Sequence, residues 1–530
     1  MAEKTPKAQK KPLYTMRNSI TNYYLLVMFT FFELFLTNQY AKARVDKYVL
    51  FIVLTVALIV SVSVISLSYK MDKNAPPEQR VVENRPFFAL SVTDVAMLVF
   101  FFGAVLSTIF SDYALDSLTG NSGRNNGLIL IFLYTAMYFI VSRYYYYKSY
   151  VFSAFMVFGC LISLLAILHF FYIDPLGLLD GYSESVAKDF GSTIGNKNTI
   201  AAYMCIFLPS AVMMFILQKN RSVKILSAVS VAFAYCGLLV SGSNSGYIGF
   251  AFMLFFMALV FVRKIHLLKD FMLALTIMFS SGLLLRLFSF ILNDKSKGFE
   301  KIGEMLIYSN LIFVIIAFCL VATVLLFIFK DKALINSKAF KNTLTIIISL
   351  IGVGAVSVFS YYFYYYSFVD TTTDIGALSQ ILRFDDRWGT HRGFMWINGV
   401  KDFLDFDFLH ILFGSGCDTF YHVFEPHFAE LSSRFNNSST NCIHSEYLNY
   451  LVTQGVVGLL SYLTLIIATV VRAFKTAKQN ELTLLFVFPV IAYCAQAVVN
   501  IYTPIVTPFV FIFIALSECI CRNSNPMNKL

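Results

Sequence analysis

The residues of this chain that could carry chemistry lie mainly between positions 383 and 460. Five of the seven histidines occur there, namely His391, His410, His422, His427 and His444. His444 begins the sequence His-Ser-Glu-Tyr, just before a long apolar run. An imidazole titrates near neutral pH and, when well placed, accelerates proton removal from a hydroxyl group about 10²–10⁴-fold. A polar residue that caps a helix is the alternative, and spacing alone leaves both interpretations open.

Two arginines in the same stretch, Arg387 and Arg392, stand before a helical pattern. A guanidinium directs two N–H donors toward phosphate oxygens and keeps its charge at physiological pH. These arginines therefore predict a binding site for phosphate groups. For Arg392 the alternative is an arginine that anchors a helix among the lipid headgroups.

Shorter polar loops contain further candidates. Arg124 is the only cation of the loop at 116–127, where several glycines would let backbone N–H groups come close to an anion. Asn196 and Asn198 stand at the start of a predicted helix, so helix capping is the alternative for them. The residues that we expect to shape a substrate site are Asn196, Asn198, Ser243, Asn244, Trp396 and Tyr447.

The composition identifies the scaffold that must position these groups. Of the 530 residues, 58% are hydrophobic and 14% charged, and the mean hydropathy is +0.69, which excludes a soluble globular protein. Apolar runs of about 18–25 residues recur, the length needed to cross a hydrocarbon core roughly 30 Å thick. We predict an all-α polytopic membrane protein with about 14 transmembrane helices, at roughly 20–38, 48–68, 87–110, 127–142, 150–172, 197–217, 225–241, 245–262, 270–292, 305–329, 342–366, 448–471, 482–502 and 504–519.

The distribution of lysine and arginine predicts how these helices are oriented. Cytoplasmic loops carry an excess of Lys and Arg, and most basic clusters fall on one side when both termini are placed in the cytoplasm. The net charge of +10 therefore reflects topology, and no nucleic-acid partner is expected. Six cations fall on the outer side against this rule: Lys42, Arg44, Lys47, Lys295, Lys297 and Lys301.

The same assignment divides the chain into four regions. They are a cytoplasmic basic tail at 1–19, transmembrane helices 1 to 11 at 20–366, a large extracytoplasmic loop at 367–447, and transmembrane helices 12 to 14 with a short cytoplasmic tail at 448–530. The active site would lie in the outer loops of a plasma membrane protein. Within the large loop, residues 393–411 have the spacing of an amphipathic helix that lies in the membrane interface.

The nine cysteines are scattered without a Cys-x-x-Cys pair, so neither a metal site nor a cofactor is predicted. Buried thiols behave as small hydrophobic groups. Cys417 and Cys442 share the large loop, and whether they form a disulfide stays open.

Several segments, in this order, together resemble the O-antigen ligase and O-antigen polymerase superfamily of polytopic membrane glycosyltransferases. The block HSEYLNYLVTQGVVGL (444–459) and the Arg392-xxx-Trp396 pattern about fifty residues before it carry most of the resemblance. The other segments are GNSGRNNGL (120–128), FGSTIGNKNTIAAYMCIFLP (190–209), SGSNSGYIGF (241–250) and LFGSGCDTF (412–420).

The resemblance implies a metal-independent transfer of a glycan from an undecaprenyl-diphosphate carrier to an acceptor hydroxyl, with inversion at the anomeric carbon. It implies that Arg392 and Arg124 contact the diphosphate and that His444 acts at the acceptor, which is a glycan or a lipid-linked chain within the membrane. We expect a polymerase of surface polysaccharide repeat units. A ligase that attaches the glycan to a lipid, wall polymer or protein stays open, as does a transporter or flippase of lipid-linked oligosaccharide.

Overall fold

The structure, a computed structural model, describes residues 15–71, 89–292, 295–329, 333–437 and 439–524. Most of the predicted basic tail (1–14) and the last six residues (525–530) lie outside this description. Ten of the described helices are long and apolar enough to cross a membrane. The predicted fold class, an all-α polytopic membrane protein, is confirmed.

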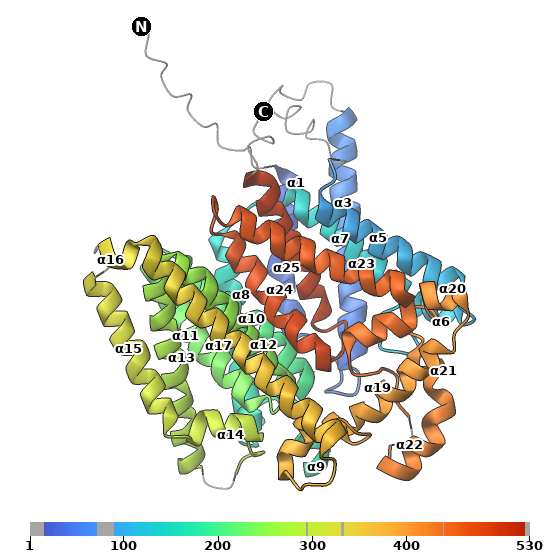
Figure 1. Ribbon diagram of the computed structural model, residues 1–530. Coiled ribbons are helices and arrows are strands. Elements are labelled where there is room, and N and C mark those ends of the chain that lie inside the picture. Colours follow the sequence, from blue (N-terminus) through green and yellow to red (C-terminus); the bar gives the residue numbers. More distant parts are fainter. Residues whose placement is uncertain (1–14, 72–88, 293–294, 330–332, 438, 525–530) are drawn as a thin grey trace.

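The described part of the chain consists of helices and one short antiparallel hairpin (Figure 1). Its first half contains α1 (Met16–Met28), α2 (Phe31–Leu34), α3 (Ala43–Met71), α5 (Val92–Ile109), α6 (Ala114–Thr119), α7 (Leu128–Tyr144), α8 (Ser149–Phe170), α9 (Glu184–Ala187), β1 (Phe190–Gly191), β2 (Gly195–Asn196), α10 (Lys197–Leu217), α11 (Arg221–Val240), α12 (Asn244–Arg263) and α13 (Ile265–Ile291).

The second half alternates long helices with short helical turns. It contains α14 (Lys301–Tyr308), α15 (Leu311–Phe329), α16 (Ala333–Asn336), α17 (Lys338–Tyr364), η1 (Tyr365–Val369), η2 (Gly376–Leu378), α18 (Ser379–Leu382), α19 (Trp388–Leu404), α20 (Phe408–Phe413), α21 (Phe420–Phe424), η3 (Glu425–His427), α22 (Phe428–Phe435), α23 (Glu446–Thr476), α24 (Thr483–Gln496), η4 (Ala497–Val499) and α25 (Thr507–Ser524). Four predicted spans correspond to α1, α7, α24 and α25, which are not among the ten candidate spans.

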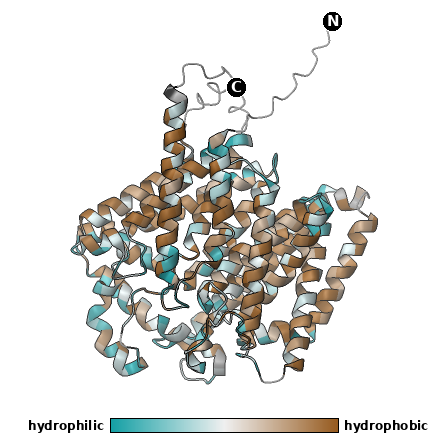
Figure 2. Cartoon of the chain, turned by 180° about the vertical axis from the view of Figure 1, so that it is seen from behind, coloured by the Kyte–Doolittle hydropathy of each residue, from teal (hydrophilic) through white to brown (hydrophobic). Residues whose placement is uncertain are grey.

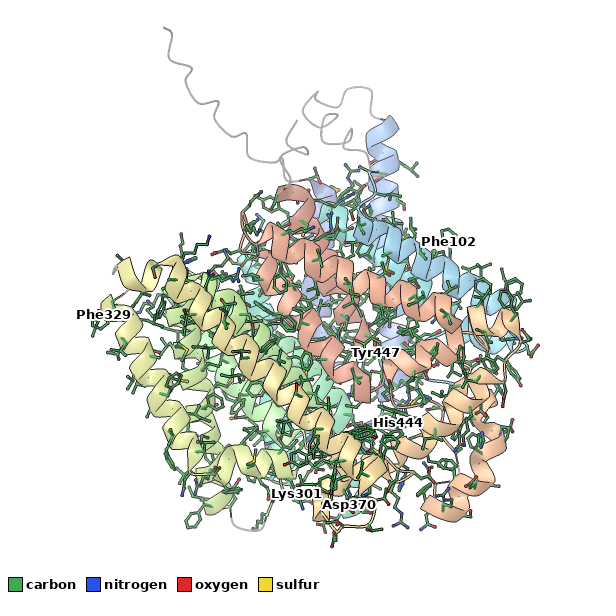
Figure 3. The ribbon with its side chains drawn as sticks, in the orientation of Figure 1. Phe102, Lys301, Phe329, Asp370, His444 and Tyr447 are labelled. Atoms are coloured by element: carbon green, nitrogen blue, oxygen red, sulfur yellow. The ribbon has the colours of Figure 1, made fainter. Side chains whose placement is uncertain are left out.

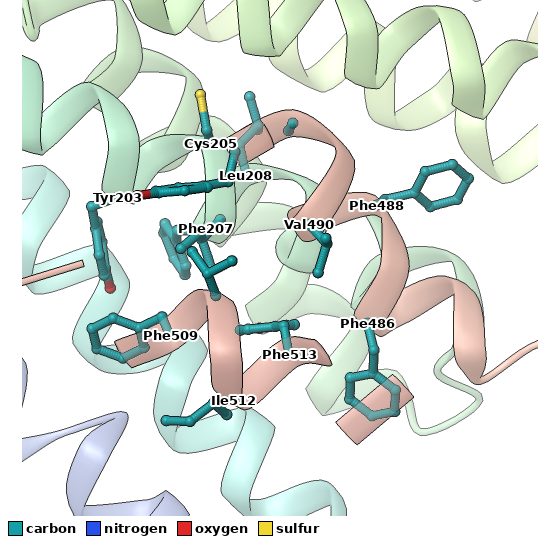
Figure 4. Close-up of a cluster of buried hydrophobic side chains, with 14 of the residues drawn as sticks. Tyr203, Cys205, Phe207, Leu208, Phe486, Phe488, Val490, Phe509, Ile512 and Phe513 are labelled. Carbon is teal, nitrogen blue, oxygen red and sulfur yellow. The ribbon is translucent and has the colours of Figure 1, made fainter. Parts of the chain in front are cut away.

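The centre of the bundle is formed by helices that are apolar on every side. In α10, 94% of the spanning window is buried, and α24 is buried along its whole length. Aromatic rings fill the space between α10, α24 and α25, where Phe486 and Phe513 lie 6.3 Å apart and Tyr203 and Phe509 6.0 Å apart (Figure 4). Such helices are expected inside a bundle, away from lipid.

The helices at the periphery have the opposite pattern. None of the α17 window and 11% of the α15 window are buried, although both helices are strongly apolar. In Figure 2 the long helices are coloured as hydrophobic along most of their length. Exposed apolar surface of this extent is what contact with a hydrocarbon phase requires.

One residue shows how the helices are directed. Arg17, near the start of α1, donates to Ser66 Oγ near the end of α3 (3.4 Å) and to the hydroxyl of Tyr144 at the end of α7 (3.5 Å). Helices α3 and α7 therefore run in the same direction. At the other end of the bundle, the loops predicted to share one side do meet; for example, Tyr40 Oη donates to the Ser192 carbonyl (2.8 Å).

Two of the cations that opposed the orientation rule have structural partners at this second end. Lys47 Nζ is buried and donates to the carbonyls of Phe32 and Glu33. Lys297 Nζ donates to the carbonyl of Ala187 (2.7 Å) and ties down the hairpin loop. Burial lowers the pKa of Lys297 to about 8.

The predicted single helix over 393–411 is wrong. The structure has two helices, α19 and α20, because Asp407 accepts hydrogen bonds from the N–H groups of Leu409 and His410 and starts a new helix. Among the apolar residues of this segment, Phe394 is buried, but Leu404 and Phe408 are 67% and 73% exposed.

Candidate functional site

A pocket of about 390 Å³ lies between the loop before α7, helix α21 and the loop before α23. It is lined by Ser122, Arg124, Tyr421, Asn437, Ser439, Thr440, Asn441 and His444. Two of the predicted site residues, Arg124 and His444, thus share one pocket although they are far apart in the chain. His444 lies just before α23 (Figure 3).

The loop that supports this pocket is hydrogen-bonded to α23 just before a break in that helix. Gly455 has a φ of 68°, which interrupts the helix. The N–H groups of Ser415 and Gly416 donate to the carbonyls of Val452 (3.1 Å) and Thr453 (2.9 Å) just before the break. The Gly-Ser-Gly sequence that ends α20 is therefore docked on α23.

Asp418, two residues after this docked segment, anchors the loop that carries Arg124. Its buried carboxylate accepts the backbone N–H groups of Arg124 (2.5 Å) and Asn126 (2.9 Å). Burial raises the pKa of Asp418 to about 7, although these two hydrogen bonds oppose the shift. The glycine-rich loop thus brings its backbone donors to an internal carboxylate.

Gly123 in this loop has no room for a side chain. A Cβ atom there would lie 2.2 Å from Asp418 Cγ and 2.3 Å from the Asp418 carbonyl oxygen. We expect Gly123→Ala to lower the free energy of unfolding by about 1–3 kcal/mol, measured by denaturant unfolding in detergent. Gly354→Ala in α17, where nothing lies within 4 Å, is the control, and equal stability of the two variants would contradict this role of Gly123.

Cys442 joins Arg124 to His444. Arg124 Nε donates to Cys442 Sγ over 3.2 Å, and His444 Nδ1 lies 3.6 Å from the same sulfur and 3.1 Å from the Cys442 carbonyl oxygen. A carbonyl oxygen only accepts, so Nδ1 carries the proton in this contact. In the neutral ring, Nε2 then holds the lone pair that a general base needs.

Helix capping does not account for His444. The N-cap residue of α23 is Ser445, whose side chain accepts from the N–H of Leu448 (3.4 Å). His444 itself has a φ of 56°, a left-handed conformation that is uncommon outside glycine. Strained backbone conformations of this kind cluster at functional sites, and His444 lines the pocket.

The buried Cys442 side chain lies between two residues that line the pocket, Arg124 and His444, without lining it itself. Burial raises the pKa of the thiol, but the charges of Arg124 and His444 and the hydrogen bonds of His444 outweigh this effect and lower the pKa to about 6. The pKa of about 6 therefore belongs to a thiolate beside a protonated His444, whereas the general-base role uses the neutral His444 ring.

This pKa predicts a pH dependence of stability. The folded pKa of about 6 lies below the ordinary value of 9.0, so between these values the unfolded chain holds a proton that the folded chain has released. Stability should rise with pH across this window and be lost as pH falls through 6. We expect Cys442→Ser to flatten the rise in unfolding temperature between pH 6 and 9; equal slopes in both proteins would contradict the thiolate.

The other two predicted anion-binding arginines, Arg392 and Arg387, differ in burial. Arg392 is half-buried, and although burial lowers the pKa of its guanidinium, the negative charge of Cys442 opposes that shift. Arg392 does not line the pocket itself. Arg387 is exposed, and its charge acts on His391, whose pKa burial and Arg387 both lower.

Trp396 and Tyr447 hold the backbone around His444. Trp396 Nε1 donates to the carbonyl of Ile443 (2.9 Å), and Tyr447 Oη donates to the carbonyl of Cys494 (2.8 Å). Both were expected to shape the substrate site, and neither lines the pocket.

The remaining candidates form a second polar cluster. Asn196 caps α10 by accepting from the N–H of Asn198 (2.9 Å), and Ser243 Oγ donates to Asn198 Oδ1 (2.7 Å). Asn244 is exposed. Asn500 Nδ2 donates to the Asn198 carbonyl (2.9 Å) and so connects this cluster with the segment at the end of η4.

That segment reaches back to the Arg124 loop. Tyr502, two residues after Asn500, accepts at its carbonyl from Asn126 Nδ2 (3.3 Å) and at its hydroxyl from Asn449 Nδ2 (2.7 Å). The two polar clusters therefore lie in one layer of the protein.

The sequence alone did not predict a site role for Asp418, for Cys442 or for the pocket-lining residues Asn437, Ser439, Thr440 and Asn441. The sequence offered one signal, since Asp418 lies in the LFGSGCDTF segment of the resemblance. The disulfide that was left open does not occur: both cysteines are free, and Cys417 Sγ lies 3.7 Å from Thr108 Oγ1 instead.

Comparison with known proteins adds no name to this site, because neither a scan of protein-family models nor a search of curated proteins finds a match to the chain. Among the residues that the structure describes, no group of three or more His, Cys, Asp or Glu side chains could hold a metal ion.

Proposed function

We propose that this protein is a glycosyltransferase that moves a glycan from an undecaprenyl-diphosphate carrier to an acceptor hydroxyl at the outer face of the cytoplasmic membrane. The observation that carries the proposal is the pocket shared by Arg124 and His444. It joins a fixed positive charge to an imidazole whose Nε2 can accept a proton.

The surroundings of the pocket support an anionic ligand. Neither Arg124 nor Arg392 is among the described arginines that form an ion pair with a carboxylate. A guanidinium near a pocket and without a carboxylate partner suits a phosphate oxygen. A lipid-borne donor also fits a chain whose outer helices expose apolar surface.

In the proposed reaction, the acceptor hydroxyl attacks the anomeric carbon from the face opposite the diphosphate. His444 Nε2 takes the hydroxyl proton as the new carbon–oxygen bond forms. The bond from the anomeric carbon to the diphosphate breaks, and undecaprenyl diphosphate leaves with the electron pair. Arg124 and Arg392 stabilise the negative charge that develops on it, which needs no metal ion.

The test is to incubate the purified protein, reconstituted in nanodiscs, with a lipid-linked oligosaccharide and to analyse the glycan by mass spectrometry. A product longer by whole repeat units supports a polymerase, and the same glycan on another lipid, wall polymer or protein supports a ligase. A glycan of unchanged mass that crosses a liposome membrane would contradict the proposal and support a flippase.

A further inference from the structure

We propose that Arg44, on the first turn of α3, is a third anion-binding arginine of this pocket, and that Arg44, Arg124 and Arg392 together favour a head group with two phosphates over one with a single phosphate. The inference rests on the proposed function and deepens it. No motif of the sequence assigns a role to Arg44, which was one of the cations that opposed the orientation rule.

The packing of α3 against α7 places Arg44 at the level of the pocket. The two helices run in the same direction, and the rings of Phe51 in α3 and Tyr134 in α7 lie 5.3 Å apart. Seven residues before each of these, or roughly 10 Å along a helix, stand Arg44 and Gly127. Arg44 is therefore level with the loop that carries Arg124.

The charged groups that act on Arg44 include Arg124, which lines the pocket, and two groups that contact the Arg124 loop. Its guanidinium interacts electrostatically with Arg124, Asp418 and Cys442. Its Nε is buried without a hydrogen-bond partner among the described residues. A buried charged donor without an acceptor is costly, and an anion bound between Arg44 and Arg124 would remove both this cost and their mutual repulsion.

The balance of charge points to a ligand with more than one negative group. None of the three arginines forms an ion pair with a carboxylate of the described residues. The opposing groups are the Cys442 thiolate and Asp418, whose pKa of about 7 leaves its carboxyl partly protonated at neutral pH. Three guanidiniums therefore exceed the internal negative charge, and a diphosphate can engage more of them than a monophosphate.

The experiment measures binding of undecaprenyl diphosphate, undecaprenyl phosphate and inorganic pyrophosphate to the full chain in nanodiscs. We expect Arg44→Gln to weaken binding of both diphosphates about 10-fold or more and to affect the monophosphate less. Arg44→Lys, which keeps the charge without the planar fork, should lose less. Lys42→Gln, two residues earlier at an exposed position, is the control and should bind as the wild type does.

Unchanged affinity of a folded Arg44→Gln variant for both diphosphates would overturn this inference and leave the proposed function standing. Binding of pyrophosphate that depends on Arg44, without binding of either lipid, would support the anion site and overturn the lipid-linked donor. If the wild type binds none of the three compounds, both the inference and the proposed function are contradicted. Monodisperse elution of each variant in size-exclusion chromatography shows that it is folded.

Discussion

Replacing His444 by alanine should lower the rate of glycan transfer by about 10²–10⁴-fold, the contribution of a well-placed general base. The reason is geometric: His444 lines the pocket, and its Nδ1 contact with the Cys442 carbonyl leaves Nε2 for the acceptor hydroxyl. Single-turnover rates with a lipid-linked oligosaccharide measure the effect directly. Binding of the donor lipid should change little, because the proposed role begins at proton transfer.

A matched histidine variant separates this role from a general loss of structure. His410→Ala removes a histidine of the same region that is paired with Asp407 (2.7 Å) and does not line the pocket. It should transfer glycan at the wild-type rate. Transfer at full rate by His444→Ala would contradict the proposed mechanism, and equal losses in both variants would assign His444 a structural role.

Replacing Arg392 by glutamine should lower the rate constant of transfer by about 10²–10³-fold, the usual effect of removing one group that stabilises developing charge. The guanidinium of Arg392 interacts electrostatically with Cys442 beside the pocket, and in the proposed reaction it stabilises the departing phosphate rather than binding the acceptor. The rate at saturating donor should therefore fall more than the affinity for the donor. Kinetics over a range of donor concentrations in nanodiscs measure the two quantities separately.

The control for Arg392 comes from the same helix. Lys401 in α19 is exposed, and Lys401→Gln removes one positive charge without touching the pocket. We expect wild-type kinetics from this variant. If Arg392→Gln matches Lys401→Gln in both rate and donor affinity, the proposed leaving-group role of Arg392 is contradicted.

The helical scaffold could be predicted because a membrane-spanning helix is recognised from the length and apolarity of its own residues. The helix predicted over 393–411 was too long because Asp407 caps the start of a second helix, α20. The apolar periodicity continues across the break between α19 and α20 and does not reveal it. The positions of Lys47 and Lys297 opposed the orientation rule because their partners are backbone carbonyls. Every residue carries a backbone carbonyl, so a sequence does not identify such partners.

The site was partly predictable for a related reason. Arg124 and His444 are charged or titratable residues in polar motifs, so their types drew attention before their contacts were known. Asp418 and Cys442 contact the loop that carries Arg124, which is distant in sequence, so their roles depend on tertiary contacts. A thiol in particular resembles a small hydrophobic residue until an arginine and an imidazole lie beside it.

In the proposed function, the pocket binds the head group of a lipid diphosphate beside a general base. The most direct measurement is an experimental structure of the protein in nanodiscs with undecaprenyl diphosphate bound. We expect density for the two phosphates between Arg124 and Arg392, with the end that carries the glycan directed to His444. Density for the head group elsewhere, with the pocket at Arg124 and His444 empty at saturating lipid, would contradict the claim.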